Sequence, residues 1–253
     1  MLTDSFFKIG KHDVCEDYAT HGPNYAIVSD GCSSGIKTDW GARLYTQLAA
    51  KYIDMGLDPI NLSFYHGLNV DVESLIGSLH LSPECTLASL GIIYEYNVHL
   101  FGDGHIVLLN KDGTIDWTEI VYDNNSPFYP RYLKYNGKAA YFDWEWYKRK
   151  VYYRKINLQD GKILDYDVSL VNDKESGLYT EFADSDSLAS FIFTDGLSSF
   201  NKNCLSLLQE LLQVKIKTSS FLQRRCKSFF KMYCTNNDIS HYDDFAVGAI
   251  IYE

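Results

Sequence analysis

Short apolar runs alternate with compact polar turns through the middle of the chain. The turns carry residues that reverse a chain readily, in the order Tyr96-Asn97, Gly102-Asp103-Gly104 and Lys111-Asp112-Gly113. Between and beside them lie four apolar runs, at 86–96, 98–101, 105–110 and 114–121. Runs of this length with tight turns predict four strands in an antiparallel meander.

Further apolar runs predict more strands, at 6–9, 24–29, 151–156, 162–168, 191–193 and 245–252. A hairpin turn is expected at Gln159-Asp160-Gly161, and a loop at 12–17. The run 24–29 lies between Pro23 and Asp30-Gly31, which is typical of a buried strand that ends at an acid.

Helical periodicity is clearest after Gly35. Apolar side chains recur at helical spacing at Trp40, Leu44, Leu48 and Tyr52. Because Thr38 can cap this segment and Gly56 can end it, we predict a helix over 38–55. Other helices are expected at 71–81, 204–214 and 220–233. Helices that precede and follow the strands, without strict alternation, favour a layered α+β fold over a parallel sheet.

The composition is that of an ordinary globular protein, with 46% apolar and 22% charged residues in 253. No linker or repeat divides the chain, so we expect a single domain over 1–253. No apolar run approaches the roughly 20 residues that span a bilayer, and a signal-peptide pattern is absent from the first residues, so we expect a soluble, cytoplasmic protein. The net charge of −10 disfavours nucleic acid and anionic membrane as partners.

Acidic residues stand at the edges of several of these apolar runs. They occur in four motifs, Cys15-Glu16-Asp17, Ser29-Asp30-Gly31, Thr194-Asp195-Gly196 and Asp243-Asp244. Carboxylates at strand ends point into a shared cleft and repel one another unless a cation neutralises them. Since Mg²⁺ and Mn²⁺ take oxygen ligands, the pattern predicts a metal-dependent enzyme whose site forms when the two ends of the chain meet.

In motif order, the chain from about 12 to 251 resembles the metal-dependent type-2C (PPM) Ser/Thr protein phosphatases, especially compact bacterial members. The matching motifs are Glu16-Asp17, Asp30-Gly31 with its following Cys32-Ser33-Ser34-Gly35 turn, Gly102-Asp103-Gly104, Asp195-Gly196 and Asp243-Asp244-Phe245-Ala246. The resemblance implies a four-layer α/β/β/α sandwich, in which two antiparallel sheets are flanked by helices. It also places a variable, flap-like segment at about 122–150.

The resemblance further implies a site with two Mn²⁺ or Mg²⁺ ions and a weaker third. Asp30 would bridge the two ions, with the Gly31 carbonyl completing one shell. Asp195 and Asp243 would hold one ion, and Glu16 and Asp17 would act on the other side. Asp103 would lie beside the third ion. Asp244 stands where an Asn is typical, so either acid of the Asp243-Asp244 pair could be the ligand, and alignment favours Asp243.

The implied reaction is hydrolysis of phosphoserine and phosphothreonine in proteins. Two ions roughly 3.5–4 Å apart lower the pKa of a bridging water, and the resulting hydroxide attacks phosphorus. Where many relatives place a phosphate-binding Arg, this chain has His12, preceded by Lys11. Asp30 and His12 are therefore the expected catalytic residues, and His12 and Lys11 the expected substrate-binding residues. As a lone histidine, His12 could equally be a surface-loop residue.

Two further departures from the family pattern are Gly104-His105, in place of Ser-Arg, and Ala246, in place of a terminal Thr. They are interpreted as packing changes that could loosen Asp103 and Asp243. The aromatic run 129–135 is interpreted as a small core beneath a loop, although substrate selection could reside there.

Two alternative functions stay open. One is a catalytically weak pseudophosphatase that binds a phosphoprotein or another partner. The other is a phosphomonoesterase for small metabolites. For the phosphatase, the expected partners are a phosphoprotein substrate and a Ser/Thr kinase or its targets, and the expected state is a monomer.

Overall fold

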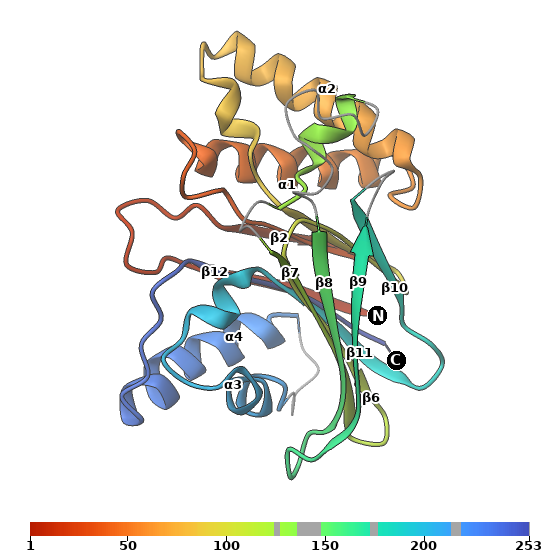
Figure 1. Cartoon of the computed structure of the whole chain (residues 1–253), viewed down its shortest axis with the longest axis vertical. Helices are drawn as coiled ribbons and strands as arrows, with labels where there is room; N and C mark the ends of the chain where they lie inside the picture. The colour runs from red at the N-terminus through yellow and green to blue at the C-terminus, as the bar shows by residue number, and fades with distance from the viewer. Residues whose placement is uncertain (124–126, 136–147, 173–176, 214–218, 253) are drawn as a thin grey trace.

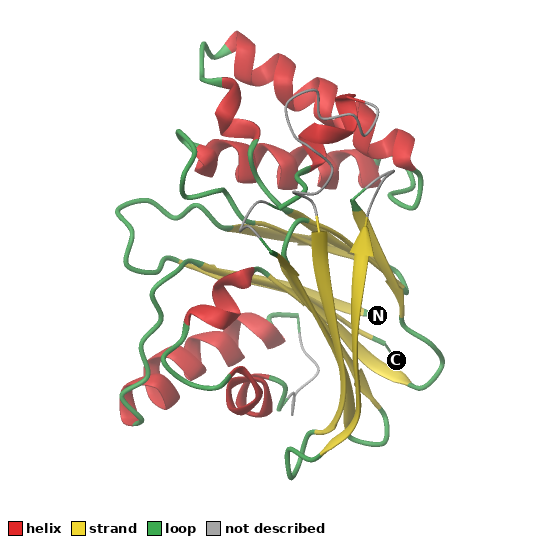
Figure 2. Ribbon diagram, in the orientation of Figure 1, coloured by secondary structure: helices red, strands yellow, loops and turns green. Residues whose placement is uncertain are grey.

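Two antiparallel β-sheets pack face to face, with helices on their outer faces (Figures 1 and 2). The structure, a computed structural model, describes residues 1–123, 127–135, 148–172, 177–213 and 219–252. The larger sheet has the order β1 (Leu2–Lys8), β12 (Phe245–Ile251), β11 (Ser187–Phe193), β6 (Gly104–Asn110), β7 (Thr114–Tyr122), β8 (Lys148–Asn157) and β9 (Ile163–Asn172). The smaller sheet has the order β10 (Leu178–Phe182), β5 (Asn97–Phe101), β4 (Leu90–Tyr94), β3 (Tyr25–Ser29) and β2 (Tyr18–Gly22).

Each sheet carries its own pair of helices, as Figure 2 shows in red. Helices α1 (Thr38–Asp54) and α2 (Leu62–Ser78) lie on the smaller sheet. Helices α3 (Cys204–Leu211) and α4 (Phe221–Ser228) lie on the larger sheet, and α4 continues as the π-helical turn η5 (Phe229–Cys234). The predicted four-layer α/β/β/α sandwich is therefore confirmed.

The core has two parts because each sheet buries both faces. Side chains between the sheets, such as Ile106 and Ile192, are fully buried and are continuous with the layer beneath α1 and α2. A second cluster lies between the larger sheet and its helices and includes Phe191 and Leu208. These two layers hold the strand ends, and so the acidic motifs, in fixed positions.

The predicted meander is wrong in one respect. β4 and β5 pair in the smaller sheet, whereas β6 and β7 pair in the larger one. The Gly102-Asp103 connection therefore crosses from one sheet to the other. Strands β2 and β10 were not predicted, and α2 begins at Leu62, well before the expected 71.

The start of α1 also differs from the prediction. Lys37, with φ 56°, is the N-cap residue, and the Thr38 hydroxyl instead donates to the carbonyl of Cys32 and to Glu16. Trp40 is 44% exposed, because the buried face of α1 is formed by smaller residues such as Ala42 and Ala49. Gly56 ends the helix with φ 83°, as predicted.

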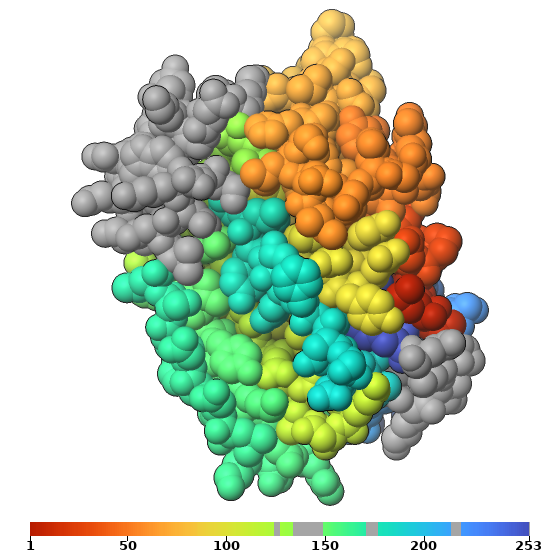
Figure 3. All heavy atoms as spheres, turned by 90° about the vertical axis from the view of Figure 1, so that its right-hand side faces the viewer, coloured from red at the N-terminus to blue at the C-terminus, as the bar shows by residue number. Residues whose placement is uncertain are grey.

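At one end of the larger sheet, β8 and β9 form a long hairpin that pairs with β7 and lies at the molecular surface, shown in green in Figure 3. Three further short helical turns complete the described chain, η1 (Pro83–Thr86), η2 (Pro130–Tyr135) and η4 (Asp195–Ser199). Of the helices in these ranges, none combines the length and apolarity that a bilayer crossing requires. Within the expected flap-like segment 122–150, residues 124–126 and 136–147 lie outside the described residues.

Candidate metal centre

The two ends of the chain meet at Asp244, directly before β12. Its carboxylate accepts hydrogen bonds from the Gly10 N–H (2.6 Å) and the Glu16 N–H (2.5 Å). Nearby, the Lys11 N–H donates to the carbonyl of Tyr242 (2.9 Å). Asp244 is only 2% exposed. Both of its carboxylate oxygens therefore serve to hold the loop at 9–17 against the start of β12.

Asp17, at the end of this loop, is held by the strand on the other side of β12. The Thr194 hydroxyl donates to Asp17 Oδ2 (2.6 Å) and accepts from the Ala246 N–H (3.0 Å). One hydroxyl thus joins the loop, the end of β11 and the start of β12. Ala246, a departure from the family pattern, is fixed here through its backbone.

Four carboxylates from separate segments converge on one pocket. Asp30 follows β3, Asp103 connects β5 to β6, Asp195 follows β11 and Asp243 precedes β12. Together with Gly31 they line a pocket of about 100 Å³. The structure thus brings together five of the predicted metal-site residues, although their roles as ligands stay a prediction.

Asp103 owes its position to the glycines that flank it. Gly102 has φ 90° and Gly104 has φ 143°, conformations that favour glycine. A Cβ at Gly104 would stand 2.6 Å from the carbonyl oxygen of Phe193. The Gly-Asp-Gly sequence therefore allows the chain to cross between the sheets while β6 lies close to β11.

The electrostatics of the pocket are those of carboxyl groups that lack a counter-charge. Burial, followed by the charges of Asp17, Asp195 and Asp103, raises the pKa of Asp30 well above its usual value. Burial, then the charge of Asp195, raises the pKa of Asp103 to about 8. Burial, then Asp243, raises the pKa of Asp195 to about 6. A bound cation would reverse each of these shifts.

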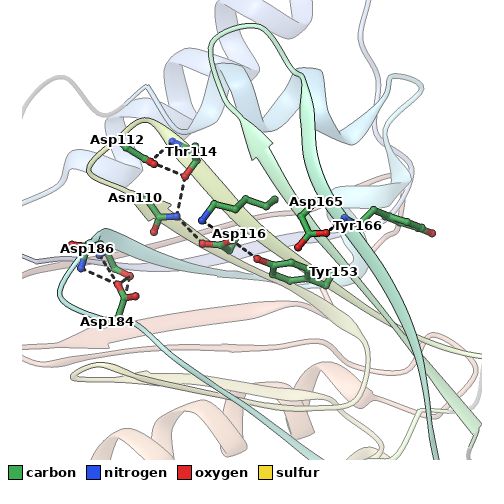
Figure 4. A network of polar contacts seen from close by, with 11 residues as sticks. Asn110, Asp112, Thr114, Asp116, Tyr153, Asp165, Tyr166, Asp184 and Asp186 are labelled. Carbon is green, nitrogen blue, oxygen red and sulfur yellow. Dashed lines mark hydrogen bonds and ion pairs between the residues drawn. The ribbon is translucent and has the colours of Figure 1, made fainter.

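At the opposite end of the β6–β7 hairpin, the acidic side chains have hydrogen-bond donors close by (Figure 4). Asp112 accepts hydrogen bonds from the N–H and hydroxyl of Thr114, and these bonds lower the pKa of Asp112. Asp116 accepts from Asn110 and from the Tyr153 hydroxyl (2.6 Å). Because local donors satisfy these acids, their cluster needs no cation.

Within the described residues, no three Asp, Glu, His or Cys side chains are arranged as a ready metal-binding group. After burial, the charges of Asp17 and Asp195 raise the pKa of Asp30, and the charge of Asp195 raises that of Asp17. Carboxyl groups that repel one another in this way are stabilised by a bound cation. The donor set itself, which consists of carboxylate and carbonyl oxygens, suits a hard divalent cation.

Glu16 lies beside this pocket and not on its wall. Its carboxylate accepts from the Thr38 hydroxyl (3.0 Å), and its carbonyl accepts from the Gly31 N–H (3.1 Å). Burial raises the pKa of Glu16. The backbone bond places Glu16 next to Asp30-Gly31.

The two predicted substrate-binding residues are placed differently. His12 Nε2 lies 3.3 Å from Asp243 Oδ1, and the side chain is 38% exposed. The Lys11 ammonium group lies 3.8 Å from the centroid of the Tyr242 ring. His12 is thus at the rim of the centre, whereas Lys11 is turned to an aromatic ring and does not line the pocket.

A second pocket, of about 260 Å³, shares Asp103, Asp195 and Asp243 with the first. His105 and Ser198 form part of its wall. Because His105 Nδ1 accepts from the Trp117 indole (3.3 Å), its Nε2 donates to the Ser198 hydroxyl (3.1 Å). Burial lowers the pKa of His105 to about 4, so this ring is neutral. The interpretation of Gly104-His105 as a packing change agrees with this buried bond.

Pro127 and Tyr129, which line the first pocket, were not among the predicted site residues. The aromatic run 129–135 was interpreted as a small core beneath a loop, with substrate selection as the alternative. Leu133, which is 3% exposed, belongs to the main core and not to a separate small one. Tyr129 packs on Tyr132 and also lines the acidic pocket.

At the level of sequence, neither a family model nor a curated protein matches the chain. Solved structures do match. The PPM Ser-Thr phosphatase MsPP from Mycobacterium smegmatis is 13% identical with a TM-score of 0.57, over 99% of this chain and 98% of that one. The catalytic domain of the phosphatase PstP, in complex with two manganese ions, is 14% identical with a TM-score of 0.54 over the same shares.

PppA, described as a key regulatory component of T6SS in Pseudomonas aeruginosa, is 14% identical with a TM-score of 0.52, over 99% of this chain and 97% of that one. At such identities the likeness concerns the fold. From the loop at 9–17 to the last strand, the chain has the fold of the type-2C (PPM) Ser/Thr phosphatases.

Proposed function

We propose that this protein is a divalent-metal-dependent phosphatase that hydrolyses phosphoserine and phosphothreonine in proteins. The proposal rests on the convergence of Asp30, Asp103, Asp195 and Asp243 on one pocket. Such a concentration of carboxylates is costly without cations. The PstP catalytic domain, which has this fold, was solved with two manganese ions.

In this proposal Asp30, the Gly31 carbonyl, Asp195 and Asp243 would hold two Mn²⁺ or Mg²⁺ ions. Asp103 would lie beside a weaker third site, and Glu16 and Asp17 would act on the other side. The ions would activate water near neutral pH and neutralise charge on the phosphoryl oxygens, so that no protein nucleophile is required.

The chain's own residues then orient the ligands and move protons. Thr194 holds Asp17, and Asp244 holds the loop that carries Glu16 and His12. The His12 ring lies at the exposed rim beside Asp243. From there it would donate a proton to the leaving alkoxide. Asp244 is a positioning residue in this scheme, and Asp243 is the ligand of the pair.

The first test is hydrolysis of p-nitrophenyl phosphate after chelator treatment, with Mn²⁺ or Mg²⁺ added back. We expect metal-restored turnover, and a loss of at least about 100-fold in Asp195→Asn, because a ligand and its charge are removed. Asp186→Asn is the matched control, since Asp186 is an exposed acid in the turn between β10 and β11. Equal activity of the Asp195→Asn protein would reject the proposal.

A second comparison separates protein substrates from small ones. Turnover on phosphoserine and phosphothreonine peptides should exceed turnover on sugar and nucleotide phosphates. Equal turnover would favour the metabolite phosphatase. The substrate protein, its kinase and the monomeric state remain predictions of the same proposal.

One observation favours the pseudophosphatase. His12, which stands where many relatives have a phosphate-binding Arg, lies 3.3 Å from Asp243 and so is paired with an acid of the pocket. A folded protein that hydrolyses no phosphoester with any divalent ion, yet binds a phosphopeptide, would identify this alternative.

A further inference from the structure

The segment that carries Tyr129 is tied to α2 beside the acidic pocket. Asn69, on α2, donates from its side chain to the carbonyl of Pro130 (2.6 Å). The Asn69 side-chain oxygen in turn accepts from the Tyr45 hydroxyl of α1 (2.7 Å). Asn69 and Tyr45 are both buried. A buried hydrogen-bond chain therefore fixes the backbone next to Tyr129 relative to both helices.

Tyr129 forms one wall of the pocket. It is 7% exposed and lines the pocket with Pro127 and with the carboxylates of Asp30 and Asp103. Its ring packs on Tyr132, with centroids 5.9 Å apart. Burial, followed by the neighbouring Cys32 thiol in the turn after Asp30-Gly31, raises the pKa of Tyr129, so its hydroxyl stays protonated. The ring is thus packed on Tyr132 and lines the acidic pocket.

The pocket is poor in donors for an anion. No Lys or Arg is among the described residues that line it. Lys11 is turned to Tyr242 and His12 to Asp243. The N–H groups of Gly31 and Cys32 are already used by the carbonyls of Glu16 and Leu87. Among the side chains on the wall, the hydroxyl groups of Ser33, Ser34 and Tyr129 can donate to a phosphoryl oxygen, and only that of Tyr129 belongs to a buried residue.

We propose that the Tyr129 hydroxyl binds a non-bridging oxygen of the substrate's phosphoryl group; this inference rests on the proposed function. A phenol O–H donates readily to a charged phosphoryl oxygen, so the Tyr129 hydroxyl binds this oxygen when substrate enters the pocket. A neutral phenol suits this position. A Lys or Arg there would pair with Asp30 or Asp103 and compete with the bound cations, whereas a phenol leaves these carboxylates free.

The test is calorimetric titration of the Mg²⁺-loaded protein with inorganic phosphate. Tyr129→Phe removes one hydroxyl and keeps the ring, so packing is preserved. We expect its dissociation constant for phosphate to be about tenfold higher than that of the wild type, the effect of one hydrogen bond to a charged group. Tyr132→Phe is the control from the same aromatic cluster and should change the constant less than twofold.

Two further measurements distinguish this role from a structural one. The Mg²⁺ concentration at half saturation and the melting temperature should be the same in Tyr129→Phe and wild type, because the hydroxyl contacts phosphate and holds no ligand. Equal phosphate affinities, no phosphate binding by the wild type, or a parallel loss of Mg²⁺ affinity would each overturn the inference. Phosphate binding is measured without turnover, so an inactive protein would refute the proposed function separately.

Discussion

Glu16 and Asp244 are joined by a 2.5 Å hydrogen bond from the Glu16 N–H to the Asp244 carboxylate, across a sequence separation of 228 residues. The Gly10 N–H donates to the other oxygen of Asp244. Asp243, the preceding residue, faces His12 and lines both pockets instead. The two adjacent acids thus have different tasks, since Asp244 holds the loop at 9–17 and Asp243 lines the pockets.

Replacing Asp244 by Asn is expected to destabilise the fold. An asparagine side chain has one acceptor oxygen, so one of the two N–H donors would face an amide NH₂ group. Loss of this buried, charge-assisted bond should lower the free energy of unfolding by about 2 kcal/mol. Urea denaturation in chelator would measure the change.

Asp243→Asn is the matched control, since the same substitution is made one residue away at a half-exposed side chain. It should change the unfolding free energy by less than about 0.5 kcal/mol in chelator and should weaken metal binding. The reverse result, with Asp243 the structural residue, would contradict the division of roles.

Gly104→Ala tests the crossing between the sheets. The added methyl group would meet the Phe193 carbonyl in a backbone conformation with φ 143°. We expect a loss of about 2–3 kcal/mol in unfolding free energy, together with a displaced Asp103. Gly113→Ala, with φ 82° but open space around the new Cβ, should cost only about 1 kcal/mol. Equal losses would show that backbone conformation, and not the close contact, sets the requirement for glycine.

Local chemistry was sufficient to predict much of this architecture. Tight turns such as Lys111-Asp112-Gly113 have few alternative conformations, so β6 and β7 were placed within a residue or two. Gly56 was identified as a helix end because only its φ fits there readily. Acids after apolar runs were expected to converge, and Asp30, Asp103, Asp195 and Asp243 do so.

The features that the sequence could not predict depend on contacts between residues that are distant along the chain. β10 is a short, half-exposed strand whose only strong signal is its pairing with β5. Thr38 is a good capping residue locally, but the carbonyl of Cys32 and Glu16 are its partners in the fold. Asp244 and Asp243 are the same residue type, and only the path of the loop at 9–17 separates their roles.

The carboxyl group of Glu181, on β10, should make the stability of the protein depend on pH, independently of the metal centre. Its Oε1 accepts from the Thr118 hydroxyl (2.7 Å), whereas its buried Oε2 has no hydrogen-bond partner among the described residues. Burial raises the pKa of Glu181 to about 7, above its usual value of 4.5. Between these values the unfolded chain releases the proton and the folded one keeps it. This group therefore makes the protein less stable as pH rises from about 4.5 to about 7, with no further change above that.

Glu181→Gln should remove this contribution. Relative to wild type, the variant should gain about 1–2 kcal/mol at pH 8 and nothing at pH 4.5, when urea denaturation is measured at both values. Glu95→Gln, at an exposed position between β4 and β5, provides the control. A wild-type-minus-variant difference that does not vary with pH would mean that Glu181 is ionised alike in both states.

Metal binding should be visible as stability even where no substrate is turned over. In chelator, Asp30→Asn should melt no lower than wild type, because a neutral amide replaces one of several unneutralised buried carboxyl groups. With Mg²⁺ or Mn²⁺ at about 100 times its dissociation constant, the wild type should gain about 2.7 kcal/mol, or several degrees in melting temperature. Asp30→Asn should gain much less, whereas Asp186→Asn should respond as the wild type does. An equal gain in Asp30→Asn would mean that the ions bind away from the Asp30–Asp195 pocket, and the candidate metal centre would have to be abandoned.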